Sequence, residues 1–192
     1  MGSNIIMAVG ALLIFGTFLS SSNRLMTTNT QIAEQNEYYI SAISLGQSII
    51  DEARTKAFDQ NVIGKTFSIP DSLTSPYNLG TEAGEAFSYP DILISSSPYT
   101  SSTPGYSSTY RFNDVDDYNG YSRTVNTPRA EGYTVKVSVG YVNEKNPDVS
   151  SATRTFCKKM SVAVTSPYFP KISNGSGSYV PDTLKLYYVF NY

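Results

Sequence analysis

Residues 5–19 read IIMAVGALLIFGTFL, a dense apolar run of about 15 residues near the N-terminus. No charged side chain occurs before Arg24. A helix that crosses a bilayer needs about 20 predominantly apolar residues, and residues 1–23 supply this length when their polar flanks reach into the interfaces. The run is apolar on every side of a helix, which disfavours a core helix with one buried stripe. We therefore expect residues 1–23 to form a helix that must be shielded from water.

A secretory signal peptide is the alternative interpretation of this segment. Signal peptides carry basic residues before the apolar run and a cleavage site with small residues after it. Residues 1–4 contain no Lys or Arg, and no clear site of the A-x-A kind follows Leu19. These two features favour a membrane-spanning or helix-packing segment.

Helical character continues beyond the apolar run, because neither Gly nor Pro occurs between Gly16 and Gly46. After Arg24, apolar residues recur at steps of three, four and seven, which places them on one face of a helix. The residues expected to pack against the rest of the protein are Ile32, Tyr39, Ile43, Ile50, Ala53 and Ala57. We predict one helix from about Asn4 to Phe58, roughly 80 Å long at 1.5 Å per residue, with an amphipathic part over residues 24–60. A 21.0 kDa globule is too small to bury such a helix, so it should protrude.

Residues 61–192 are predicted to form a strand-rich globular head. The segment 95–109 reads SSSPYTSSTPGYSST, lacks apolar periodicity and is typical of a loop. Four other runs alternate as half-buried strands do, namely residues 121–125, 132–142, 156–164 and 184–192. They predict an antiparallel meander with one face to cover. The expected fold class is therefore α+β, a long protruding N-terminal helix packed by its second half against a C-terminal antiparallel sheet.

The composition excludes several classes of function. The 192 residues contain no His and a single Cys, Cys157. Ser-His-Asp and Cys-His mechanisms, most zinc sites and an internal disulfide are therefore ruled out. Two lysines follow Cys157 and would lower the pKa of its thiol, although a lone cysteine in a strand is more often a small apolar residue. A net charge of −2 argues against nucleic-acid binding. We expect no enzymatic activity and no cofactor, apart from one candidate structural cation.

That candidate is an oxygen-rich cluster just before Gly120, made of Asp114, Asp116, Asp117 and Asn119. Ca²⁺ prefers several carboxylate and carbonyl oxygens from a short loop, so a structural calcium site is one interpretation. The spacing is not that of an EF-hand, because Asn126 occupies the position where that motif has its last glutamate. We favour the other interpretation, in which these side chains accept hydrogen bonds from nearby backbone amides in turns.

Three sequence features carry a family resemblance. An uncharged apolar N-terminus runs without a break into an amphipathic helix, and that helix contains QSIIDEA at residues 47–53. The segment FNDVDDYNGY at 112–121 precedes YTVKV at 133–137 and KMSVAVTSP at 159–167. In this combination the chain resembles the type IV pilin superfamily, which includes the pseudopilins of type II secretion. It is most similar to minor pilins of the mannose-sensitive haemagglutinin type.

The resemblance implies a structural subunit that polymerises through its apolar helix into an extracellular type IV pilus-like filament, as a major or a minor subunit. The residues implied in the filament core are Ile5, Ile6, Val9, Leu12, Leu13, Phe15, Phe18 and Leu19. The implied partners are copies of the chain itself, other pilins, the membrane assembly machinery and a prepilin peptidase, with no nucleic acid. The implied location is the inner (cytoplasmic) membrane before assembly and a cell-surface filament afterwards. A type II secretion pseudopilin and a monomeric, membrane-anchored adhesin are the alternatives.

The sequence departs from the family at one position. The family usually has a Glu a few residues into the mature chain, which meets the N-terminal amine of a neighbouring subunit. Ile5 occupies this place if Met1 is the first mature residue, and Met7 occupies it if Ser3 is. A lone ammonium group in an apolar core is costly. We therefore expect another acceptor, such as the Asn4 side chain or backbone carbonyls, or a modified amine.

Overall fold

The computed structural model describes residues 2–82, 85, 109, 111–128, 130–173, 175 and 177–192. The Ser/Thr-rich segment predicted as a loop at 95–109 lies outside these residues apart from Thr109. The chain divides into two compact units, Met1–Tyr38 and Tyr39–Tyr192. The second unit begins at Tyr39 and so includes the last turns of the helix, which contribute to its core.

Helix α1 spans Gly2–Ala53 without interruption, which confirms a single long N-terminal helix. It ends five residues before the predicted end at Phe58. Beyond Ala53 the backbone hydrogen bonds span three residues, as in a 3₁₀ helix, since Lys56 N donates to Ala53 O at 3.1 Å. Ala57 then pairs with another segment: its N donates to Asn113 O at 3.1 Å, and its O accepts from Val115 N at 3.0 Å. A tertiary backbone pairing therefore ends the helix, at a point where the sequence has neither Gly nor Pro.

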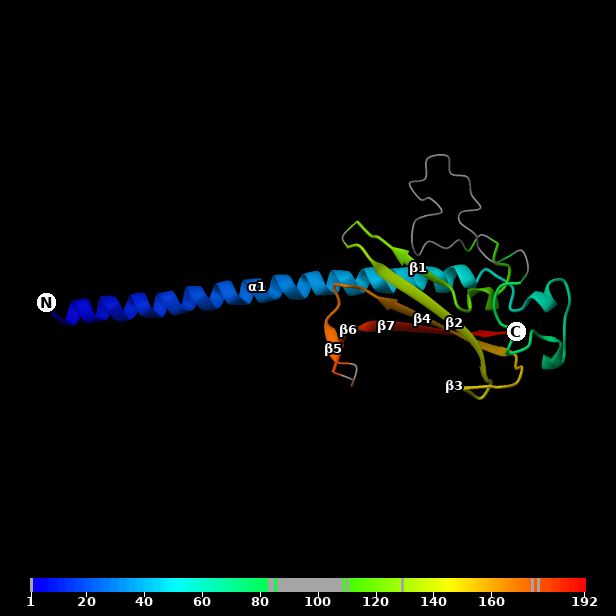
Figure 1. Ribbon diagram of the computed structural model, residues 1–192. Helices are drawn as coiled ribbons and strands as arrows, with labels where there is room; N and C mark the ends of the chain where they lie inside the picture. The colour runs from blue at the N-terminus through cyan, green and yellow to red at the C-terminus, as the bar shows by residue number, and fades with distance from the viewer. Residues whose placement is uncertain are drawn as a thin grey trace, which may run out of the picture. The chain divides into compact units, whose positions relative to one another are not determined.

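The predicted antiparallel meander is confirmed. Its strands are β1 (Ser122–Val125), β2 (Tyr133–Asn143), β4 (Cys157–Thr165) and β7 (Thr183–Asn191), in the order β1-β2-β4-β7. Figure 1 shows β2, β4 and β7 side by side, and every pairing is antiparallel.

Short elements complete the second unit. Strand β3 (Asn146–Ser150) pairs with β2, and β5 (Lys171–Ser173) pairs with β6 (Tyr179–Pro181) in a separate ribbon. Among the described residues between α1 and β1 are the 3₁₀ helices η1 (Gln60–Val62), η2 (Pro70–Ser72) and η3 (Asp116–Tyr118).

One face of the sheet packs on the last turns of α1, and alternate residues of β2 and β4 are buried there. A Cβ on Gly46 would collide with Leu186 of β7 and lie 3.5 Å from Val164 Cγ2 of β4. Only a residue without a side chain lets the helix approach these strands so closely. The core therefore lies between the C-terminal part of α1 and the sheet, as the sequence predicted.

The buried face of α1 is rotated from the predicted one. The buried helix residues are Ala42, Gly46, Ile49, Ile50 and Ala53. The prediction is therefore confirmed for Ile50 and Ala53. It is wrong for Ile43, which is 44% exposed. The prediction followed large apolar side chains, whereas the contact face uses Ala42 and Gly46 so that the helix can approach the sheet.

The other three residues predicted to pack between helix and head behave differently from one another. Tyr39 is half-buried and stacks on Phe169 with ring centroids 4.5 Å apart. Ala57 is half-buried and contributes its backbone pairing. Ile32 belongs to the first unit, where its side chain is exposed.

Candidate functional site

The first unit presents an apolar helix surface without protein cover. All eight residues expected in a filament core are between 46% and 74% exposed. The described residues contain one helix that is long and apolar enough to cross a membrane, and its most apolar 18-residue window is entirely unburied. Leaving this much apolar area in water is unfavourable by about 25 cal/mol per Å². The segment therefore needs lipid, or other apolar helices, around it.

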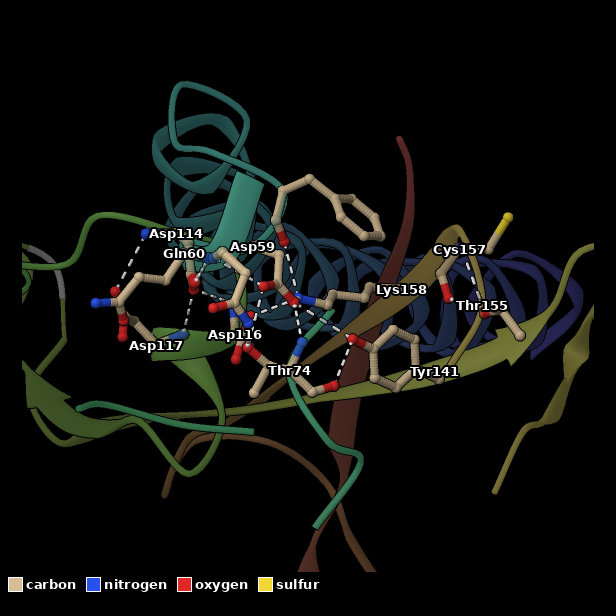
Figure 2. A network of polar contacts seen from close by, with 12 residues as sticks. Asp59, Gln60, Thr74, Asp114, Asp116, Asp117, Tyr141, Thr155, Cys157 and Lys158 are labelled. Carbon is tan, nitrogen blue, oxygen red and sulfur yellow. Dashed lines mark hydrogen bonds and ion pairs between the residues drawn. The ribbon is translucent and has the colours of Figure 1, made fainter. Parts of the chain in front are cut away.

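The second unit contains a buried ion network centred on Lys158 of β4, whose side chain is 0% exposed. Its Nζ donates to Phe58 O at 2.8 Å, to Asp59 Oδ2 at 2.9 Å and to Asp116 Oδ1 (Figure 2). The ammonium also lies over the ring of Phe58, 4.8 Å from its centroid, and 5.4 Å from the centroid of the Tyr141 ring. An ammonium has three N–H donors, and all three have an acceptor here.

Asp59 anchors one side of this network. Its carboxylate caps η1 by accepting from Asn61 N at 3.1 Å, and it also accepts from Thr74 N at 2.9 Å and from the Tyr141 hydroxyl at 3.3 Å. Burial alone would raise the pKa of Asp59, but the attraction of Lys158 and these hydrogen bonds outweigh it, so the pKa is lowered. Asp59 is therefore a buried carboxylate held in its charged form.

On the other side of Lys158, the loop around η3 uses its carboxylates as caps. Asp114 Oδ1 accepts from Asp116 N at 2.8 Å and from Asp117 N at 3.2 Å, and its Oδ2 accepts from Gln60 N. Asp117 Oδ2 accepts from Asn113 N at 2.8 Å and from Asp114 N at 3.1 Å. The favoured interpretation, that these side chains bond nearby backbone amides, is confirmed for Asp114 and Asp117, whereas the carboxylate of Asp116 accepts from Lys158 instead.

Asn119, the fourth residue of the predicted cation cluster, does not join the three aspartates. Its Nδ2 donates to Leu79 O at 3.0 Å and its Oδ1 accepts from Val139 N at 3.0 Å. Both polar atoms of the amide therefore bridge backbone segments instead.

Two glutamates that sequence reasoning missed lie against these aspartates. Carboxylate oxygens of Glu82, Glu85 and Asp117 lie within 4.8 Å of one another, and so do those of Glu82, Asp114 and Asp116. Burial and the neighbouring negative charges raise the pKa of Asp114 to about 8 and that of Glu82 to about 8. We define these five residues as the acidic cluster, in which negative charges oppose one another.

Lys158 and Asp59 were also missed, although a signal for Lys158 was present. The alternation that assigned Met160, Val162 and Val164 to one strand face assigns Lys158 to the same face. A lysine on an inward face predicts a buried counter-ion. Glu82 and Glu85 gave no comparable signal, because their segment lacks periodicity and is distant in sequence from the loop they contact.

Cys157 is not an activated thiol. It is buried, and its Sγ donates to Asn191 Oδ1 at 3.0 Å. Burial raises the pKa of the Cys157 thiol, and the negative charge of Glu144 adds to this effect. The lowering predicted from the adjacent lysines is wrong, because Lys158 and Lys159 direct their ammonium groups to carboxylates instead.

The chain combines a long apolar N-terminal helix with an antiparallel sheet, which is a pilin-like architecture. Comparison with protein-family models, with curated proteins and with solved structures found no match to this chain.

Proposed function

We propose that this chain is a structural, pilin-like subunit that polymerises through its apolar N-terminal helix into an extracellular type IV pilus-like filament. The observation that carries the proposal is the exposed apolar surface of residues 5–19 on a helix that continues into a folded β-sheet unit. A bilayer would cover this surface before assembly, and the same surface on neighbouring copies would cover it in the filament. The β-rich unit would then form the outside of the filament.

A second observation favours polymerisation over a monomeric anchor. Leu25, Met26 and Ile32 are exposed, yet they follow Arg24 and so lie outside the uncharged membrane-length window. A monomeric anchor has no use for apolar residues beyond that window. In a filament, these residues would extend the helix-to-helix contact, where packing of apolar side chains drives association.

The first test is electron microscopy of sheared cell-surface material, with N-terminal sequencing of the 21.0 kDa chain. Filaments that contain the chain would support the proposal, and the first residue would establish whether a leader is removed. A chain that stays in the membrane fraction, with no filament containing it, would favour a pseudopilin or an anchored adhesin.

Two matched substitutions separate anchoring from polymerisation. Leu12 and Leu25 have similar exposure, 69% and 64%, but only Leu12 lies in the uncharged run. An aspartate at a helix centre in the bilayer costs about 3 kcal/mol, so Leu12→Asp should abolish both membrane retention and filaments. Leu25→Asp should leave the chain in the membrane and abolish filaments.

Asn29→Asp is the control, because it adds the same charge at a position that is already polar. It should leave both membrane retention and filaments unchanged. If Leu25→Asp assembles as well as Asn29→Asp does, the helix does not polymerise through this surface and a monomeric anchor explains the chain better.

A further inference from the structure

The acidic cluster brings together carboxylates from two separate segments. Glu82 and Glu85 come from the segment that follows η2, while Asp114, Asp116 and Asp117 come from the loop around η3. Among these five residues, Lys158 donates a hydrogen bond only to Asp116. The same ammonium group also donates to Asp59, which lies outside the cluster. One ammonium group therefore faces more carboxyl groups than it can pair with.

Two carboxylate oxygens of the cluster are buried without a partner. Asp116 Oδ2 and Asp117 Oδ1 accept no hydrogen bond from any described residue, and their side chains belong to residues that are 0% and 1% exposed. The second oxygen of each carboxylate is engaged, by Lys158 and by backbone amides respectively. Burying a charged oxygen without a donor or a cation is costly, so a cation beside these two atoms would stabilise their charged form.

Further oxygens lie beside these two. The amide oxygen of Asn113 is also buried without a partner, while its Nδ2 donates to Glu85 Oε1. Neutral donors reach the glutamates as well: Glu82 N donates to Glu85 Oε2 at 3.2 Å, and the Gln60 amide can be oriented to donate to Glu82 Oε2 at 2.8 Å. None of these donors reaches the free oxygens of Asp116 and Asp117, which stay available as ligands.

The geometry and the ligand chemistry select the cation. Ca²⁺ binds six to eight oxygens at about 2.3–2.6 Å, so two ligands of one ion lie at most about 5 Å apart. Within each of the two carboxylate groups the ligand oxygens lie within 4.8 Å of one another, which fits that limit, and Glu82 belongs to both groups. The cluster offers oxygen and no sulfur or imidazole, which disfavours zinc and copper. Mg²⁺ demands a tighter octahedron and keeps its waters, whereas several convergent carboxylates suit Ca²⁺.

We propose that the acidic cluster binds one Ca²⁺ ion through Glu82, which belongs to both carboxylate groups, and through the aspartates beside it. The ion joins the segment after η2 to the loop around η3 and neutralises the free carboxylate oxygens there. The site is structural, since both segments adjoin the residues that end α1 and surround Lys158. This inference does not depend on the proposed function, because it concerns the second unit alone.

The test uses the full chain in detergent after removal of divalent cations with a chelator. Bound calcium is measured by isothermal titration and by elemental analysis, and the melting temperature (Tm) is followed as CaCl₂ is added. One ion per chain is expected, with a Tm that rises with the logarithm of the Ca²⁺ concentration, as for any ligand that binds only the folded state. Extracellular calcium modules bind at about 0.1–1 mM, so the titration extends to about 10 mM.

Asp117→Asn is the key variant. The asparagine oxygen can still accept from the Asn113 and Asp114 amides, while an NH₂ group replaces the free oxygen. We expect it to weaken calcium binding about 10-fold or more, by analogy with charge loss in other oxygen sites. Asp148→Asn is the matched control, because Asp148 is exposed and, among the described residues, forms its ion pair with Lys159 at 2.8 Å. It should leave calcium binding unchanged.

Two results would overturn the proposal. The first is no bound ion and no shift in Tm at about 10 mM Ca²⁺, which would mean that the carboxylates share protons instead. The second is an equal shift with Mg²⁺ at the same concentration, which would indicate charge screening rather than a calcium site. Both measurements use the unsubstituted chain, so they stand even if a variant fails to fold.

Discussion

Lys158→Met is the substitution that tests the buried ion network most directly. Methionine has a similar length and volume, so it keeps the packing against Phe58 and Tyr141 but removes the three donors. Asp59 Oδ2, Asp116 Oδ1 and the carbonyl of Phe58 each lose a hydrogen bond. Two carboxylates then remain buried without their shared cation.

The magnitude follows from the state of those carboxylates. Removing one partner of a buried ion pair costs about 3–5 kcal/mol. Each carboxylate can escape by taking up a proton, and at pH 7 this costs about 4 kcal/mol for a group of ordinary acidity. The loss is therefore about 3–5 kcal/mol, a large part of the 5–15 kcal/mol that stabilises a typical domain. For a unit of this size it corresponds to a fall in Tm of roughly 10 °C.

The assay is a thermal melt followed by near-ultraviolet circular dichroism, with the full chain in detergent and a chelator present. The chelator separates this prediction from calcium binding, in which Asp116 takes part. Lys159→Met is the matched control. Lys159 is the next residue of the same strand, its side chain is 21% exposed, and its partner Asp148 is 90% exposed. Such a surface pair contributes about 0–1 kcal/mol, so this variant should melt close to the unsubstituted chain.

A second variant checks that charge, rather than shape, causes the loss. Lys158→Met combined with Asp59→Asn and Asp116→Asn removes the buried charges together with the cation. This triple variant should regain part of the lost Tm, because a neutral buried network carries a smaller desolvation cost. Equal melting temperatures for Lys158→Met and Lys159→Met would refute the reasoning, since they would mean that Lys158 is solvated and does not hold the carboxylates.

Three further predictions concern the packing and acidity of the second unit. Gly46→Leu should destabilise the second unit by about 1–3 kcal/mol through overpacking, because the new side chain would meet Leu186. Gly16→Leu is the control, since Gly16 has open space around it, and it should leave the melting temperature in detergent unchanged. Ile50→Ala should cost about 2–5 kcal/mol and Ile43→Ala far less, because Ile50 is buried and Ile43 is exposed; equal losses would contradict the observed helix face. The pKa of Asp59 is lowered from its ordinary value of 3.8, so its stabilising contribution is fully present above that value and is lost as the pH falls through the folded-state pKa. Denaturant titrations at acid and at neutral pH would measure the free energy of unfolding of the unsubstituted chain and of Asp59→Asn. The difference between the two should become smaller at acid pH. A larger difference there would contradict a lowered pKa for Asp59.

The sheet was predictable from sequence because alternation is a strong and local signal. A strand with one buried face repeats every two residues, and the order of the strands follows when neighbours in sequence pair antiparallel. β2, β4 and β7 therefore lie close to the predicted runs. The short strands β5 and β6 have three residues each, too few for alternation to distinguish them from a loop.

The sequence predicted one long N-terminal helix, but it did not predict where the helix ends or which of its faces packs against the sheet. Its end depends on the backbone pairing of Ala57 with residues 113–115, which are more than fifty positions away in sequence. Its contact face uses Gly46 and Ala42, whose absent or small side chains let the helix lie close to the sheet. A pattern of large apolar residues cannot reveal a close approach that small residues permit.

The candidate site was predictable only in part, for a similar reason. The aspartates of the η3 loop are adjacent in sequence, so their capping role followed from composition. The glutamates that complete the acidic cluster come from another segment, and only the tertiary structure brings them near. Lys158 could have been found by applying the strand alternation to a charged residue as strictly as to its apolar neighbours.

The two units require different surroundings, and this allows their roles to be tested separately. The apolar run of the first unit gains free energy only in lipid or among other apolar helices. The second unit is held by its own core and by the network of Lys158. A charge at Leu12 should therefore change where the chain is found without lowering the Tm of the β-rich unit. Lys158→Met should lower that Tm without changing membrane retention at temperatures below the melt. If the two effects were not separable in the double variant, folding of the second unit would depend on the environment of the first, and an assembly surface that acts independently of the head would no longer explain the chain.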